Sequence, residues 1–107
     1  MKIVNLTPHA INFVGEAGEA LMTIEPSGKI VRVTAKTVTT GNINGIPVTE
    51  TVFGEVENLP LPTSDTIYIV SSLVAQRFKD RDDVFIPNES VRDEKGRVIG
   101  CKSLGKI

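Results

Sequence analysis

The dipeptide Asn44-Gly45, which stands between two isoleucines, constrains the fold of this chain more than any other local feature. A type I′ turn requires a positive φ at both of its central residues, and Asn-Gly is the pair that adopts this conformation most readily. We therefore predict a β-hairpin over residues 39–51 that turns at Asn44-Gly45. Pro47 removes a backbone N–H donor from the second strand of this hairpin, which predicts that this strand lies at the edge of a sheet.

Short β-rich runs bounded by turn residues continue on both sides of this hairpin. The pattern changes once, where the apolar strand Thr66–Val70 leads into Ser71-Ser72 and then into apolar residues at helical spacing. A further strand, Val84–Ile86, is predicted to end at Pro87-Asn88, so strand, helix and strand form one parallel βαβ-like unit. The other predicted elements are strands at Lys2–Leu6, Ala10–Val14, Ala20–Ile24 and Lys29–Thr34, and a hairpin around Glu94-Lys95-Gly96.

These elements predict an α+β, mainly β, fold: a small mixed sheet or partly open barrel with one short helix. At 107 residues, the chain is expected to form a single domain over residues 1–107. Aromatic residues make up only 5% of the chain and tryptophan is absent, so aliphatic side chains must form most of the core.

Charge and hydropathy exclude several classes of protein. The formal net charge is −1, which argues against the basic stripe that binding to nucleic acid or to an anionic membrane requires. No apolar stretch reaches the length of a membrane-spanning helix. The segment Met1–Asn5 lacks the apolar run of a signal peptide, and a single cysteine forms no intrachain disulfide, so we expect a cytoplasmic protein.

Several short motifs occur in an order that is distinctive as a set. The chain has Asn-Leu-Thr-Pro-His at residues 5–9, Pro-Ser-Gly followed by an arginine at residues 26–32, Gly54 with Leu59-Pro60, Ile-Val-Ser-Ser at 69–72, Arg-Asp-Asp at 81–83, and Arg-Asp, Gly-Arg and Gly-Cys at 92–101. Together they resemble a family of small uncharacterised proteins from bacteria and their phages, prophages included. The resemblance implies a bacterial or phage setting and assigns no chemistry.

Two residues could carry catalysis. His9 follows Thr7-Pro8, and a histidine on a rigid turn can act as a base, a ligand or a phosphate contact. The alternative is a histidine that only bonds a nearby carbonyl group. Cys101 needs an activating base to be a nucleophile, and His9 is the only histidine available. The alternative is a buried, inert cysteine. One histidine and one cysteine do not complete a zinc site, and we expect neither a metal nor a cofactor.

A candidate anion site lies where the strand Thr66–Val70 meets the helix. A helix start offers free N–H groups and partial positive charge, and Ser71 and Ser72 place two hydroxyl groups there. Arg32 and Arg92 are candidate partners, because arginine binds phosphate and carboxylate groups with two parallel hydrogen bonds. We include His9 among the candidate ligand-binding residues.

Each residue of this candidate site has a structural alternative. The serines are also preferred helix caps. Arg92 could pair with Asp93 or Glu94, as we expect Arg81 to pair with Asp80 or Asp83.

Three functions follow. The first is a non-enzymatic module that binds a small anionic ligand or a host protein. The second is a structural or assembly protein that acts as a homo-oligomer, since edge strands and a small core make pairing of subunits plausible. The third, a small enzyme using His9 and Cys101, is the least supported.

Overall fold

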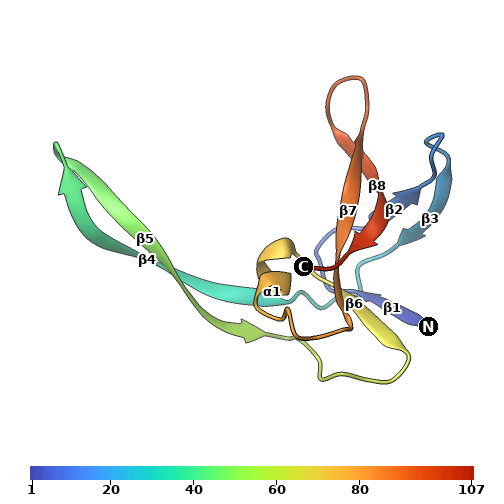
Figure 1. Ribbon diagram of the computed structural model, residues 1–107, viewed down its shortest axis with the longest axis horizontal. Coiled ribbons are helices and arrows are strands. Elements are labelled where there is room, and N and C mark those ends of the chain that lie inside the picture. The colour runs from blue at the N-terminus through green and yellow to red at the C-terminus, as the bar shows by residue number, and fades with distance from the viewer.

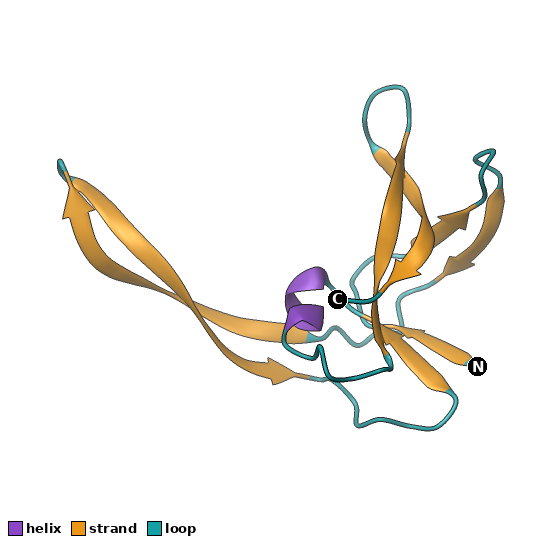
Figure 2. Cartoon of the chain, in the orientation of Figure 1, coloured by secondary structure: helices purple, strands orange, loops and turns teal.

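The structure is a computed structural model that describes all 107 residues, and it contains eight strands and one short helix (Figures 1 and 2). The elements in chain order are β1 (Lys2–Asn5), β2 (Ile11–Val14), β3 (Ala20–Ile24), β4 (Arg32–Ile43), β5 (Ile46–Glu57), β6 (Thr66–Ile69), α1 (Ser72–Gln76), β7 (Val84–Arg92) and β8 (Val98–Gly105).

Six strands form one mixed sheet in the order β1-β6-β7-β8-β2-β3, and β4 pairs only with β5. Strand β6 is parallel to both β1 and β7, whereas β7–β8 and β2–β3 are antiparallel hairpins. The sheet stays open, with β1 and β3 as its edges. The predicted mainly β fold with a mixed sheet and one short helix is therefore confirmed.

The predicted βαβ-like unit is present as β6, α1 and β7. Tyr68 and Ile69 pair with Val84 and Phe85 in a parallel register. Val74 and Ala75 are the two buried residues of α1, and they belong to a cluster with Tyr68. The helix thus covers one face of the sheet directly beside the strand that precedes it.

Side-chain alternation along β6 divides the core between the two faces of the sheet. Tyr68 and Val70 belong to the first cluster, under α1, whereas Ile69 belongs to a second cluster with Ile11, Phe13 and Cys101. Only 14 of the 107 residues are buried, so both clusters are small.

The hairpin of β4 and β5, called the arm below, projects away from the sheet (Figure 1). Its two strands are each 12 residues long, which corresponds to about 40 Å. The radius of gyration is 17.0 Å, whereas a compact chain of this length would have about 13 Å. The molecule consequently has a small body and one long extension.

Two sequence-based expectations about strands need correction. The predicted hairpin over residues 39–51 exists, but its strands run from Arg32 to Glu57. The strand beginning at Val84 does not end at Pro87, because β7 continues to Arg92 and pairs Pro87 with Leu104 of β8. Strand β6 ends opposite Phe85, so no neighbour on that side needs the N–H group that Pro87 lacks.

Candidate functional site

The turn of the arm has the backbone conformation that its sequence predicts. Asn44 has a φ of 52° and Gly45 a φ of 84°, both in the left-handed region that a type I′ turn requires. Ile43 pairs with Ile46 immediately below the turn. The tip of the arm is therefore a tight turn that presents two large apolar side chains.

Register and alternation place most of the exposed apolar side chains of the arm on one face. Strand β5 pairs without interruption from Ile46 to Phe53, so every second residue points to the same side. Directly opposed partners share that side, which adds the paired residues of β4. We define the apolar face as Val38, Ile43, Ile46, Val48 and Val52, all of them exposed.

The opposite face of the arm has four threonines in its middle, with Pro47 towards the tip and the exposed Phe53 towards the root. Thr37 pairs with Thr51, and Thr39 pairs with Thr49, so four threonines form two cross-strand pairs there. We call them the threonine face. The arm is thus amphipathic, with one side suited to an apolar partner and the other to water.

Charged side chains flank the middle of the apolar face. Lys36 is opposite Val52, and Glu50 is opposite Val38, so both charges lie on the apolar side. Neither Lys36 nor Glu50 takes part in any of the five ion pairs of the chain. Their charges are available to a partner.

The root of the arm is the end at which β4 begins and β5 ends. Apolar and polar contacts attach it to the body. Val33 and Val56, which are paired across the arm, pack against the first core cluster. Arg77, the C-cap of α1, donates a hydrogen bond to the Gly54 carbonyl at 2.8 Å, and Asn58 donates one to the Ile30 carbonyl at 3.2 Å. The root is therefore fixed, while the remainder of the arm extends into solvent.

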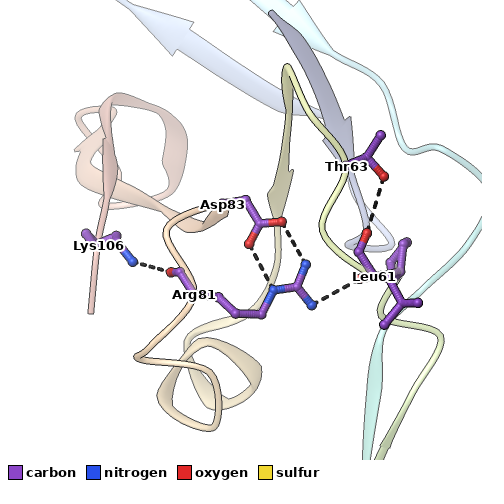
Figure 3. A network of polar contacts seen from close by, with 6 residues as sticks. Leu61, Thr63, Arg81, Asp83 and Lys106 are labelled. Carbon is purple, nitrogen blue, oxygen red and sulfur yellow. Dashed lines mark hydrogen bonds and ion pairs between the residues drawn. The ribbon is translucent and has the colours of Figure 1, made fainter.

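A polar network beside the root joins the segment after β5 to the body (Figure 3). Arg81 binds both carboxylate oxygens of Asp83, at 2.9 and 2.7 Å, and also donates to the Pro60 carbonyl at 3.0 Å. Lys106 donates to the Arg81 carbonyl. The hydrogen bonds from Arg81 hold the pKa of the Asp83 carboxyl below its usual value. The predicted pairing of Arg81 with a neighbouring acid is confirmed, with Asp83 as the partner.

A cleft of about 670 Å³ lies at the root of the arm, between the segment before β4 and the segment after β5. Lys29 and Arg32 line it on one side and Glu57 on the other. Arg32 is exposed and directly opposite Glu57 in the register of the arm. Arg32 is the only one of the five candidate ligand-binding residues that lines this cleft.

The two serines of the candidate anion site act at the start of α1. The Ser71 hydroxyl accepts a hydrogen bond from the Val74 N–H group at 3.4 Å, so Ser71 is the N-cap and Ser72 the first helical residue. The helix is only five residues long. The structural alternative, an N-cap, describes what Ser71 does here.

Arg92 serves the β7–β8 hairpin rather than the start of the helix. Its guanidinium donates to the Gly96 carbonyl at 2.7 Å, and the neighbouring Asp93 pairs with Arg97 at 3.0 Å. The structural alternative for Arg92, an ion pair with Asp93 or Glu94, is not observed, because its guanidinium bonds the backbone of the turn. Backbone N–H groups of Arg97 and Lys95 lower the pKa of Asp93.

His9 is exposed, and its contribution to the structure is its backbone carbonyl. That carbonyl accepts hydrogen bonds from the Asn5 amide at 2.8 Å and from the Thr7 hydroxyl at 3.0 Å. Asn5 is only 1% exposed, and its amide also reaches the Ile24 carbonyl at 3.1 Å. Sequence reasoning singled out His9 in this motif and missed Asn5, although a polar residue between apolar neighbours at a strand end was the available signal.

Cys101 has the environment of an inert thiol. It is 4% exposed, within the second core cluster, and burial raises the pKa of its thiol. Backbone hydrogen bonds from Asn88 and Ser103 oppose that rise only in part. The groups around the thiol thus favour its neutral form.

The structure contains no cluster of three or more His, Cys, Asp or Glu side chains that could hold a metal ion. Its single helix is five residues long, and no helix of the structure meets the length and hydropathy that crossing a bilayer requires. No protein-family model, curated protein or solved structure matches this chain. The exposed apolar face makes the arm the best-defined candidate for a functional element.

Proposed function

We propose that this chain is a structural or assembly protein, of bacterial or phage origin, that acts in the cytoplasm as a homo-oligomer and uses the arm to contact other copies. The observation that carries this proposal is the apolar face, whose five members are between 38% and 67% exposed. Apolar side chains grouped along one extended element are typical of a contact surface.

The energetics of a two-stranded ribbon support a partner for the arm. An isolated hairpin is marginally stable in water, because two strands bury little apolar surface. Beyond its root, the arm has no third strand and no covering helix. A second copy that covers the apolar face would supply the missing burial, and the threonine face would remain hydrated.

The test is a comparison of variants on the two faces by sedimentation velocity over a concentration series. Val48→Ser and Val52→Ser remove apolar surface from the apolar face, whereas the matched controls Thr49→Ser and Thr51→Ser change the threonine face of the same strand. We expect the wild type and both controls to self-associate and the two valine variants to dissociate. A wild type that stays monomeric up to millimolar concentration would overturn the proposal and direct attention to a different protein as the partner of the arm.

A second candidate function, binding of a small anionic ligand, is favoured by the root cleft. Its volume of about 670 Å³ lies within the usual range for ligand pockets, and Lys29 and Arg32 outnumber Glu57 on its walls. Thermal-shift measurements with pyrophosphate and with nucleoside diphosphates test this candidate. We expect a rise in melting temperature that Arg32→Ala abolishes and that Arg92→Ala, remote from the cleft, retains; no rise with any anion would remove this candidate.

A further inference from the structure

We infer that the apolar face of the arm in one copy binds a groove at the opposite end of the next copy, so that the subunits join head to tail. This inference rests on the proposed function and adds the identity of the receiving surface. The groove lies on the second-cluster face of the sheet, across β1, β2, β3 and β8, and has a volume of about 290 Å³. The lining residues that matter here are Phe13, Leu21, Met22, Ile24, Leu104 and Lys102.

The groove has the chemistry expected of a surface that receives apolar side chains. Leu21 is 63% and Met22 is 52% exposed, while Phe13, in the floor, is buried. These residues continue the second core cluster outward, since Ile24 and Leu104 pack against it. Strand β3 forms the edge of the sheet, and its free backbone groups border the groove. An amphipathic ribbon can therefore pack its side chains on the groove and lie alongside the free edge of β3.

The accessible surface of the molecule favours two contact areas in each subunit. The total is 7426 Å², whereas a compact monomer of this mass would expose about 5,800 Å². The excess of about 1,600 Å² equals the total area of one interface of standard size, to which each partner contributes about 800 Å². A subunit in a head-to-tail chain contributes its arm to one interface and its groove to another, and two contributions of standard size, about 800 Å² each, would match the excess. A symmetric dimer of two arms would cover half of it.

The charges of the two surfaces also favour pairing of the arm with the groove. Glu50 lies on the apolar side of the arm without an ion-pair partner. Lys102 lies at the groove, and its contact within the chain is Glu16 at 3.5 Å, whose side chain is 94% exposed. Because that pair is held loosely at the surface, Lys102 is available to the carboxylate of Glu50 from a neighbouring copy.

The two surfaces lie at opposite ends of the molecule. Figure 1 shows the tip of the arm at one end of the longest axis and β2 and β3 at the other. The arm is therefore directed away from the groove of its own chain. A contact between two different surfaces of identical subunits is heterologous, and it produces closed rings or open filaments.

The test exchanges the two charges between copies. We expect Glu50→Lys alone and Lys102→Glu alone to weaken self-association at least tenfold in sedimentation velocity. An equimolar mixture of the two variants should associate again, because every arm then finds a groove of opposite charge. Glu55→Lys, on the arm, and Lys95→Glu, at the β7–β8 turn, are matched charge reversals away from the contact and should behave as the wild type does.

A second pair of variants tests the contact without any change of charge. Ile46→Ser removes an apolar side chain from the arm, and Met22→Ser removes one from the groove. Each variant alone should dissociate, and their mixture should form dimers only, because just one intact arm and one intact groove can meet. Circular dichroism melting of each variant verifies that the exposed substitutions leave the body folded.

The possible outcomes separate this inference from the function on which it rests. If the wild type never associates, the proposed function fails. If the wild type associates and the arm variants dissociate while Met22→Ser and Lys102→Glu do not, the arm is still the contact, but the groove is not its receptor. That result would indicate arm-to-arm pairing. It would overturn the inference about the groove and leave the proposed function standing.

Discussion

At the scale of single residues, many polar side chains of this protein form hydrogen bonds with backbone N–H and carbonyl groups. Asn5 is the clearest case, since its buried amide organises the loop between β1 and β2 through Thr7 and His9 and joins it to Ile24. Its oxygen accepts from the Thr7 N–H group at 3.0 Å and from the Thr7 hydroxyl at 2.6 Å. Asn5 and Thr7 of the N-terminal motif thus order the loop that follows β1.

We predict that Asn5→Ala lowers the free energy of unfolding by about 2–4 kcal/mol, because several buried hydrogen-bonding groups lose their partner at once. His9→Ala, which leaves the carbonyl in place, should change it by less than about 0.5 kcal/mol. Urea unfolding measures both values. A large loss for His9→Ala would show that the ring has a role that the structure does not reveal.

The pair of Arg81 and Asp83 predicts a dependence of stability on pH. Arg81 lowers the pKa of Asp83 in the folded chain, so this carboxylate contributes stability above its unfolded pKa of about 4. The contribution is lost as the pH falls through the lower folded value. Asp83→Asn should therefore be less stable than the wild type at pH 7, with a difference that shrinks in acid. Asp82→Asn, at an exposed neighbouring position, is the matched control; a difference independent of pH would contradict the assignment.

Burial of Cys101 predicts slow reaction with thiol reagents. Because burial raises the pKa of its thiol, native labelling should be slow and should begin at higher pH than labelling of the chain unfolded in urea. A disulfide reagent that releases a coloured thiolate on reaction allows both rates to be measured by absorbance. Rapid native labelling with an acid-shifted profile would restore the interpretation of Cys101 as a nucleophile activated by His9.

At the scale of elements, the sequence could predict mainly those features that depend on a few neighbouring residues. Asn44-Gly45 defined the turn, and Ser71 defined the start of α1, because each acts through its own backbone neighbourhood. The length of the arm was not predictable in this way. Thr34, Thr40 and Gly54 lie where the register shifts, and those irregularities interrupt the alternation by which a continuous strand is recognised in sequence.

The turn assignment predicts different effects for two glycines of the arm. Gly45 has a φ of 84°, whereas Gly41 has an ordinary strand conformation, and neither site has an atom within 4 Å of a Cβ. Gly45→Val should cost about 1–2 kcal/mol at the tip, raising the exchange rates of arm amides measured by NMR. Gly41→Val, the matched control, should leave them unchanged or lower. Equal effects of the two substitutions would show that the turn lies elsewhere.

At the scale of the whole molecule, the body and the arm depend on different interactions. Both core clusters lie in the body and at the root, and no residue between Lys36 and Thr51 belongs to either. At this scale, Ser71, Arg92 and His9 each serve a separate cap, turn or loop, and their joint binding of an anion stays a prediction. Sequence spacing does not reveal which turns of a mixed sheet come together, since this depends on strand order.

Replacement of residues 37–51 by a two-residue Asn-Gly turn, which then joins the paired residues Lys36 and Val52, should leave a folded body. We expect the melting temperature to stay near that of the wild type, because both core clusters are retained. The radius of gyration in small-angle X-ray scattering should fall towards about 12 Å. Val33→Ser, a substitution at the root, is the contrasting variant and should lower the melting temperature. Unfolding of the shortened chain would mean that the arm stabilises the body.

The contacts of Arg77 with Gly54 and of Arg81 with Pro60 lie at the root and set the angle between the arm and the body. An angular change of about 10° at the root would displace the tip of a 40 Å arm by about 7 Å. The curvature of any chain of subunits would then be determined at the root, far from the surfaces that touch. Substitutions there could turn a ring into a filament, or alter its diameter, without weakening a single contact between copies.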